Sequence, residues 1–365
     1  MKVLIPTLRS DLIGGKETFT RDLALGLERR GHTAVVLAEP HPHAARGMAA
    51  DGVRVCTDWN DIGFAPDIIH GQHTVDTMVA LTRCPDAPAF YQVHGAAAFS
   101  SPQPHPRIYR YGTMTGSLAN RLSIEMGLPR QSFVVVQNTA DLSRFANVRE
   151  PPARPSKALF YSSYHRPESR TFEAARAAAE QCALEFHCVG RPFGNRIEQP
   201  EGFLPGFDLV FACGLSAIEA LCCGCAVIVL GMTSCGEMVL PENFERFRAA
   251  NFTIPFNAVP PSVADIVAAI ETYDAMTLRG VTALSRTACD GSRMIGEMID
   301  LYGTILAEHG MAERNEPAER RALAGMLRTW SPVVNLNDRH VTFEPTKWRS
   351  ALRSIGAQIT RMEDR

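Results

Sequence analysis

The 365-residue sequence has no apolar run that approaches the roughly 20 residues needed by a membrane-spanning helix. Its opening, MKVLIPTLRS, falls short of the roughly 7–15 apolar residues that form the core of a signal peptide. An excess of one charge is also missing, since 37 basic and 39 acidic residues leave a net charge of −2. A nearly neutral chain has no overall attraction to nucleic acid or to an anionic membrane. We therefore expect a soluble, cytoplasmic protein that does not bind nucleic acid.

The ten cysteines lack the paired CxxC spacing that is typical of a zinc site. In a cytosolic chain they should mostly remain reduced thiols. Adjacent Cys222 and Cys223, in the segment CGLSAIEALCCGC, would point about 100° apart on a helix. We interpret these cysteines as small, buried packing residues, with metal or redox chemistry as the alternative. The residue that stands out in this segment is then Glu219, the one carboxylate within an apolar run.

Short apolar runs alternate with amphipathic segments along the chain. KVLIP and TAVVLAE flank a glycine turn and a helical pattern that ends at Gly31, which is a β-loop-α-β unit. The polar, proline-rich NVREPPARPSK interrupts the alternation, which then restarts, so it is the best linker candidate. The pattern predicts an α/β fold with a first domain at 1–146, a linker at 147–156, a second domain at 157–310, and a helical tail of unassigned role at 311–365.

Gly214, Leu215 and Ser216 lie where the apolar run DLVFA meets a helical segment. Free amides and the helix dipole at such a point favour an anion, and glycine allows a close backbone approach. Gly14 and Gly15 form a corresponding loop after the first strand, with an ordinary flexible turn as the alternative. The GxGxxG fingerprint of a dinucleotide site is absent. Lys16, at the start of the next helix, is expected to face solvent.

Four stretches, taken in order, resemble the family 4 retaining glycosyltransferases of the GT-B fold. They are GGKETFTRDLALGLERRGHTAVVLAE, the pair PDIIHGQH and FYQVHG, VVVQNTADLSRF, and FACGLSAIEALCCGCAVIV. The resemblance covers roughly residues 1–310 and implies two Rossmann-like domains that face each other across a cleft. It implies an acceptor site mainly on the first domain and a nucleotide-sugar site mainly on the second. The sequence departs from the family at Phe211, where the first of two motif glutamates would stand, and at Gln137–Asn138–Thr139, where the family has PNG.

The resemblance also implies roles for single residues. Glu219 would accept both ribose hydroxyls, and His94 would contact the donor sugar and the reacting centre. Arg166 and Arg170 would meet the diphosphate, because arginine forks suit phosphate oxygens. The alternatives are a glutamate that caps its own helix or meets an arginine, a core histidine, and two surface arginines. Glu237 follows a glycine-containing loop and is a candidate contact for acceptor or sugar, against a solvated loop glutamate. His94 and Glu219 are thus the predicted catalytic residues, and the predicted residues that bind the donor or its phosphates are Gly14, Gly15, Arg166, Arg170, Gly214, Leu215, Ser216 and Glu219.

The implied activity is that of a retaining, hexosyltransferase-like enzyme. It would move a sugar from a nucleotide sugar to a hydroxyl of a glycan, a lipid-linked molecule or a small molecule. No carboxylate pair has a glycosidase-like placement, so a front-face route, in which the leaving diphosphate takes the acceptor proton, is favoured over double displacement. His70, His73 and His94 have no carboxylate at ligand spacing. We therefore expect no metal ligands, no cofactor and no required divalent cation.

Several readings stay open at this point. A nucleotide-sugar epimerase of the same fold and a non-catalytic nucleotide-sugar-binding protein, the latter suggested by Phe211, are the alternatives to a transferase. A nicotinamide dehydrogenase is a third, against which the missing glycine fingerprint counts. The sequence leaves open the sugar, the nucleobase, the acceptor and the oligomeric state. It also leaves open whether the tail touches the inner membrane surface or a partner chain.

Overall fold

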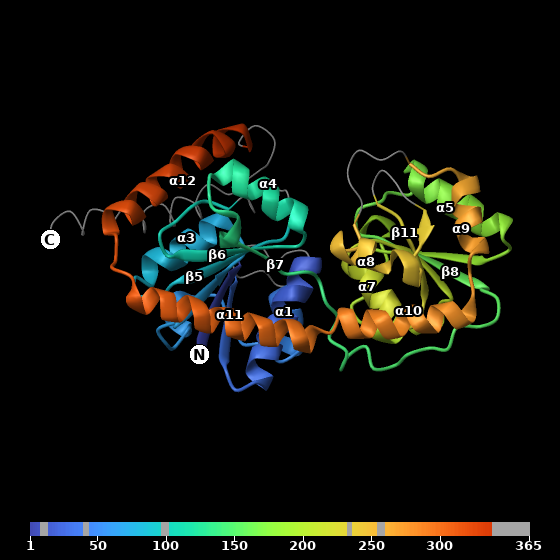
Figure 1. The fold of residues 1–365 in the computed structure, drawn as a ribbon, viewed down its shortest axis with the longest axis horizontal. Coiled ribbons are helices and arrows are strands. Elements are labelled where there is room, and N and C mark those ends of the chain that lie inside the picture. The colour runs from blue at the N-terminus through green and yellow to red at the C-terminus, as the bar shows by residue number, and fades with distance from the viewer. Residues whose placement is uncertain (8–13, 39–43, 96–101, 232–235, 254–259, 338–365) are drawn as a thin grey trace.

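Two α/β lobes make up the structure, a computed structural model that describes residues 1–7, 14–38, 44–95, 102–231, 236–253 and 260–337 (Figure 1). One sheet has seven strands in the order β3-β2-β1-β4-β5-β6-β7, and the other has five in the order β12-β11-β10-β8-β9. All strand pairs are parallel except β11 with β12. The strand order reverses between β1 and β4 in the first sheet and between β8 and β10 in the second. Both sheets are therefore doubly wound, and ligands bind such sheets beyond the carboxyl ends of the strands at the reversal.

The first sheet is buried on both faces, as its continuous apolar runs predict. In β1, Leu4 packs with α3 and α4, whereas Val3 and Ile5 pack with α1 on the opposite face. The strands are β1 (Lys2–Thr7), β2 (Thr33–Ala38), β3 (Val55–Cys56), β4 (Ile68–Gly71), β5 (Ala89–Val93), β6 (Ile108–Thr113) and β7 (Phe133–Val135). The helices are α1 (Gly15–Arg29), α2 (Ala44–Ala50), α3 (Thr74–Arg83) and α4 (Gly116–Met126).

The second sheet is covered in the same way. Val210 packs with α7 and α10 on one face, and Phe211 packs with α5 and α9 on the other. The strands are β8 (Lys157–Tyr161), β9 (Glu185–Val189), β10 (Leu209–Ala212), β11 (Ala226–Val229) and β12 (Glu237–Met238). The helices are α5 (Arg170–Gln181), α6 (Pro200–Phe203), α7 (Leu215–Cys222), α8 (Pro241–Ala249), α9 (Val263–Glu271) and α10 (Ala275–Ala288).

The cysteines that crowd around Glu219 are packing residues of this second lobe. Cys222, Cys223 and Cys225 are buried in the core formed with α7 and α10. Every cysteine in the described ranges is a free thiol. Burial raises the pKa of Cys223 to about 12, so this thiol stays protonated and unreactive at neutral pH.

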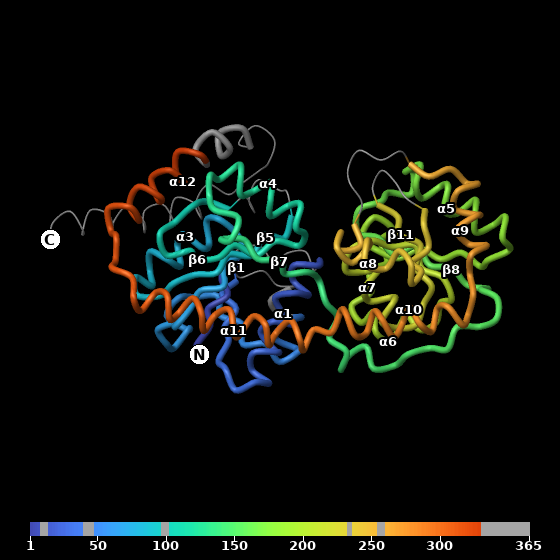
Figure 2. Tube along the Cα trace, in the orientation of Figure 1, coloured from blue at the N-terminus to red at the C-terminus, as the bar shows by residue number. Residues whose placement is uncertain are grey.

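The last two helices, α11 (Gly291–Met311) and α12 (Glu316–Asn337), return to the first lobe. Figure 2 shows α10 along the second lobe and α11 continuing along the first. Met298 and Tyr302 of α11 lie in the first-lobe core with α1, and Met326 of α12 lies in the core on the other face. The structure thus differs from the predicted boundary at 310, because α11 belongs by packing to the first domain. An apolar stripe at helical spacing does not specify which of two cores it covers. None of the helices within the described ranges has the length and apolar character needed to cross a bilayer.

The chain crosses between the lobes twice, and the two crossings are hydrogen-bonded to each other. The Ala140 amide donates to the Cys289 carbonyl at 2.9 Å, and the Gly291 amide donates to the Ala140 carbonyl at 2.9 Å. A Cβ on Gly291 would lie 3.0 Å from that carbonyl oxygen, so the close approach favours glycine. Paired crossings of this kind form the hinge between the two domains.

Candidate functional site

Helix α7 begins directly after β10, and its first turn is the predicted anion site. Gly214 precedes the helix with a φ of +60°, a conformation that favours glycine. Its carbonyl accepts the Ile218 amide at 3.2 Å, which closes the first turn. The amides of Leu215, Ser216 and Ala217 therefore have no intrahelical acceptor, as at the start of any α-helix. These three groups point a partial positive charge out of the helix start.

The amino end of α1 faces this helix start from the other domain. A Cβ on Gly15 would lie 3.9 Å from Leu215 Cδ2, so the two helix beginnings are in near contact. The Gly14 amide donates to Glu17 Oε2 at 2.8 Å, which holds the glycine loop against α1. The structure thus brings the predicted pair Gly14–Gly15 together with Gly214–Ser216, although they are about 200 residues apart in the chain. An anion between them would meet two helix dipoles.

Glu219 lies one turn into α7 and is 4% exposed. The Tyr161 hydroxyl donates to its Oε2 at 3.3 Å. The Glu219 pKa is raised to about 8, mainly by burial and also by the Asp22 carboxylate, while the Arg21 guanidinium opposes the rise. Asp22 and Arg21 belong to α1, so charged groups of the first domain act on the Glu219 carboxyl group. It is mainly protonated at neutral pH, so it can donate one hydrogen bond and accept others.

Tyr161 and Asp22 are site residues that the sequence reasoning missed. Tyr161 ends β8, and its hydroxyl interacts with the side chains of both Glu219 and Ser216. Burial raises the Asp22 pKa to about 6, against the Arg21 guanidinium 2.8 Å away. Arg144 links the two domains near Asp22. Its Nη1 lies 3.8 Å from Asp22 Oδ1, and its Nη2 lies 2.8 Å from Glu201 Oε2 of α6. Only the position of Tyr161 at the carboxyl end of a parallel strand could have signalled its role.

His94 follows β5 on the first-domain side. Its Nε2 lies 2.7 Å from Gln72 Oε1, and the Gln72 amide nitrogen donates to Thr20 Oγ1 at 2.9 Å. With Gln72 Oε1 as acceptor, Nε2 carries the proton, and none of the described residues is a hydrogen-bond partner of the buried Nδ1. Burial lowers the His94 pKa well below its ordinary value, and the nearby His70 and Lys16 lower it further. The imidazole is therefore neutral, with one nitrogen available to accept a hydrogen bond.

Lys16 lies in this site rather than in solvent, so the expected exposure is wrong. Its side chain is 14% exposed, Nζ donates to Thr7 Oγ1 at 2.9 Å, and Glu17 Oε1 is 3.1 Å away. The reason is that α1 starts beside the end of β1, where Thr7 lies. A cation is thus held near Gly15 at the domain boundary.

Three of the predicted charged site residues have exposed side chains. Arg166 and Arg170 are exposed, the first in the turn after β8 and the second at the start of α5. Glu237 opens β12 and forms an ion pair with Arg246, with 3.2 Å between Oε1 and Nη1. A different cation, Arg196, lies close enough to Glu17 of the first domain and to Tyr161 of the second for electrostatic interaction. Its position in an irregular loop carried no sequence signal.

His70 and His73, the other two histidines considered as metal ligands, have structural partners. His70 is fully buried, its Nδ1 lies 2.5 Å from the Tyr302 hydroxyl of α11, and burial lowers its pKa to about 3. His73 lies 3.4 Å from the Asp76 carboxylate within α3. Across the residues that the structure describes, no three His, Cys, Asp or Glu side chains gather as metal ligands would. His70 thus fastens α11 to the first sheet.

The position of the missing motif glutamate lies inside the second-domain core. Phe211 is fully buried in β10, with its ring centroid 6.3 Å from that of Phe186 and 6.4 Å from that of Phe160. A side chain there faces α5 and α9 and not the start of α7. Phe211 therefore contributes to the core and offers no group to a ligand.

No protein-family model and no curated protein matches this sequence. Solved structures are similar in fold. The Anabaena protein HepE in complex with UDP-glucose has 14% identity and a TM-score of 0.59, covering 83% of this chain and 100% of that chain. A glycosyltransferase from Rickettsia africae has 12% identity and a TM-score of 0.59, over 84% and 98% of the two chains. A putative UDP-N-acetylglucosamine 2-epimerase from Listeria monocytogenes has 15% identity and a TM-score of 0.52, over 86% and 98%.

Identities this low establish architecture alone. The two doubly wound sheets and the near-complete coverage of these neighbours agree with one another. The predicted pair of Rossmann-like domains is confirmed, and the chain has the GT-B fold.

Proposed function

We propose that this protein is a retaining glycosyltransferase that moves a sugar from a nucleotide-diphosphate sugar to a hydroxyl acceptor. The observation that carries the proposal is the meeting of two helix beginnings, at Gly15 and Leu215, with Glu219 one turn behind the second. The free backbone amides and the helix dipoles at these two helix starts favour a bound anion. Fold neighbours described as a UDP-glucose complex and as a glycosyltransferase support the substrate class.

In this proposal the second domain holds the donor. The amides of Leu215, Ser216 and Ala217 and the Ser216 hydroxyl bind the diphosphate, and Gly214 permits its close approach. The Glu219 carboxyl binds the two ribose hydroxyls, with its orientation fixed by Tyr161 at 3.3 Å. Lys16 and Arg196 supply positive charge from the two sides of the cleft, while Arg166 and Arg170 contribute from the outer surface.

The first domain holds the acceptor, and His94 meets the transferred sugar. The unpartnered Nδ1 of a neutral imidazole can accept a hydrogen bond from a sugar hydroxyl without adding positive charge near the developing oxocarbenium ion. The leaving diphosphate takes the acceptor proton in a front-face reaction. Closure of the domains excludes water, which would otherwise hydrolyse the donor. We propose that the reaction requires no divalent cation.

A nucleotide-sugar epimerase is the second candidate, because an epimerase is among the fold neighbours with a TM-score above 0.5. It would use the same donor site without an acceptor. Incubation with nucleotide sugars alone distinguishes the two, since only an epimerase converts the donor into its epimer. A non-catalytic binding protein would bind the nucleotide sugar and leave it unchanged, whichever acceptor is added.

The donor site is tested by thermal unfolding with UDP, thymidine diphosphate and their sugars. We expect one diphosphate to raise the Tm by several degrees, and Glu219→Ala to remove most of this rise. The matched control is Glu180→Ala, an exposed glutamate of α5, which should retain it. Absence of stabilisation by any nucleoside diphosphate, or equal stabilisation of both variants, would contradict the proposal.

A further inference from the structure

Two consecutive residues just after helix α8 have unusual backbone conformations. Asn251 has a φ of +54° and Phe252 a φ of +50°, and they are 2% and 0% exposed. Non-glycine residues rarely adopt this region, least of all a bulky aromatic one. Such a conformation persists where the surroundings determine it, and it is often found at positions with a functional task. The contacts of these two residues show what holds them.

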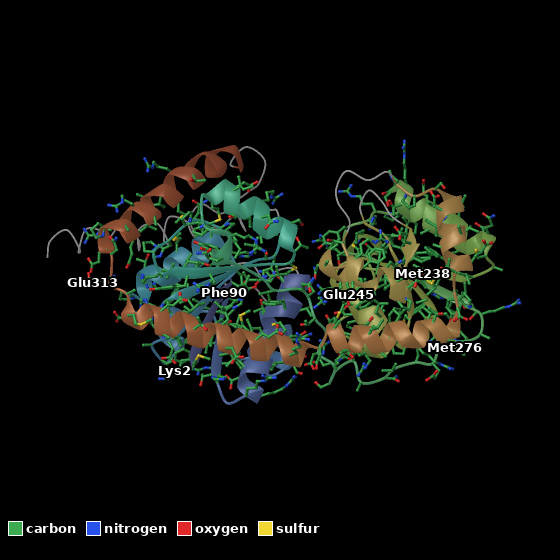
Figure 3. The ribbon with its side chains drawn as sticks, viewed as in Figure 1. Lys2, Phe90, Met238, Glu245, Met276 and Glu313 are labelled. Carbon is green, nitrogen blue, oxygen red and sulfur yellow. The ribbon has the colours of Figure 1, made fainter. Side chains whose placement is uncertain are left out.

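The Asn251 side chain reaches from the second domain into the first. Its Oδ1 accepts the Asn138 amide at 2.8 Å, and its Nδ2 lies 3.3 Å from Met114 Sδ. Met114 follows β6, and Asn138 begins the crossing between the domains. The side-chain oxygen and the side-chain nitrogen of Asn251 therefore both contact the first domain. In Figure 3, Glu245 marks α8 on the side of the second lobe that faces the first.

The peptide that follows holds the start of α7. The Phe252 carbonyl accepts the Gly214 amide at 2.7 Å, directly before the amides proposed to bind the diphosphate. The Phe252 amide itself donates to the Phe247 carbonyl of α8 at 2.7 Å. Within two residues the chain thus joins the first-domain crossing to the phosphate-binding turn.

A second residue of α8 fixes the same crossing. Arg248 Nη1 donates to the Asn138 carbonyl at 2.8 Å, and the Gln137 side chain donates to the Arg248 carbonyl. Asn138 is therefore bonded to Asn251 through its amide and to Arg248 of α8 through its carbonyl. Any rotation of the second domain relative to the first must either break these bonds or shift residues 251–252 relative to the rest of the second domain.

We propose that Asn251 is a positioning residue that couples the orientation of the two domains to the placement of the Gly214 amide. This inference rests on the proposed function, in which the start of α7 holds the donor diphosphate. Asn251 bonds to the crossing, and the next residue, Phe252, accepts the Gly214 amide. Binding of the diphosphate at the start of α7 and this arrangement of the two domains should therefore stabilise each other. Such coupling is reciprocal, so a change at the crossing must weaken the diphosphate site.

The first test uses the unliganded protein. Asn251→Gly keeps the positive φ and removes the side-chain amide, so the backbone path is retained. We expect hydrogen exchange at the Gly214 amide to become at least about fivefold faster, while exchange in β9 stays unchanged. Ala183→Gly is the matched control, because Ala183 also has a positive φ, +56°, but lies at the end of α5, away from the crossing. It should leave the Gly214 exchange rate as in the wild type.

The second test measures the Kd for UDP and thymidine diphosphate by calorimetry. Loss of one buried partner predicts about tenfold weaker binding in Asn251→Gly. Asn251→Asp keeps the oxygen that accepts the Asn138 amide and tolerates the same φ, so it should recover most of the affinity. The Asn251→Asp variant also keeps the inference testable if Asn251→Gly folds poorly. An equal loss of affinity in both variants would overturn the inference.

The outcomes separate this inference from the proposed function. Wild-type protein that binds no nucleoside diphosphate ends the proposed function and the inference together. Wild-type binding with an unchanged Kd and unchanged Gly214 exchange in Asn251→Gly ends the inference alone. Faster exchange throughout the second domain would also overturn it, because that result describes general destabilisation.

Discussion

The Tyr161 hydroxyl donates to Glu219 Oε2 at 3.3 Å and so ties the end of β8 to the middle of α7. Burial holds the pKa of both groups above their ordinary values. At neutral pH the tyrosine is therefore un-ionised and Glu219 is mainly protonated. A bound ribose would meet an acid group that is already oriented and carries little charge. The unliganded protein should consequently show the cost of ionising Glu219 as the pH rises.

The first prediction concerns this pH dependence. The folded Glu219 pKa of about 8 exceeds the ordinary value of 4.5. Its contribution to stability is complete below pH 4.5 and is lost as the pH rises towards 8. We expect a loss on the order of 2–4 kcal/mol in the free energy of unfolding between these limits, and Glu219→Gln should abolish it. Urea unfolding of both proteins at several pH values measures the difference.

The comparison with Glu219→Gln also isolates this effect from other groups. Asp22 should give a smaller loss that ends near pH 6 in both proteins, because its pKa is raised to about 6. His70, whose pKa is lowered to about 3, acts in the opposite direction and is common to both. Parallel curves for the two proteins would show that Glu219 ionises normally.

The second prediction concerns Lys16. Its ammonium group, at 14% exposure beside Gly15, is positioned to attract the diphosphate. Lys16→Met should weaken UDP or thymidine diphosphate binding by about tenfold, because a partly buried charge is weakly screened by salt. The matched control is Lys157→Met, since Lys157 is 50% exposed and pairs with Glu185. Equal affinities for the two variants would remove Lys16 from the site.

The third prediction tests the return of α11 to the first lobe. A Cβ on Gly26 of α1 would lie 2.6 Å from Ile295 Cγ1, so Gly26→Ala should cost about 1–3 kcal/mol of stability. Gly303 lies on the same helix α11, and a Cβ there would meet nothing within 4 Å. Gly303→Ala should therefore stabilise by up to about 1 kcal/mol. Chemical denaturation of both variants measures the contrast, and similar effects of the two would refute this packing.

The fourth prediction concerns divalent cations. If the two helix beginnings and Lys16 balance the diphosphate charge, transfer should continue in excess EDTA at more than about half its rate. The measurement is product formation with and without chelator, using the donor identified by thermal unfolding. Complete loss that is restored by added Mg²⁺ or Mn²⁺ would contradict the proposed charge balance.

Much of the architecture could be predicted, because its signals are local. Val3–Ile5 and Val227–Val229 are continuous apolar runs, which is how strands covered on both faces appear in a sequence. Gly214 stands out in the sequence because glycine at the start of a helix allows a close backbone approach. The placement of α11 could not be predicted, since Met298 and Tyr302 would suit either core.

The site depends on relations between distant residues, and these have no local signal. The charges that act on Glu219 come from Arg21 and Asp22, nearly 200 residues away in the chain. Lys16 lies inside because Thr7 provides an acceptor at the end of β1. Arg166 and Arg170, whose roles are assigned by resemblance, are exposed, and a motif gives a position but not its surroundings.

Because both ends of the described chain lie in the first lobe, the second lobe is in effect an insertion between Ala140 and Gly291. A single proteolytic nick in the proline-rich stretch near Pro152 would leave the halves tethered through α11. A fragment cut after residue 146 would lack the helix that covers α1 and should precipitate. Domain exchange between such proteins therefore needs two junctions, and a chimera joined at only one would separate α11 from its own core.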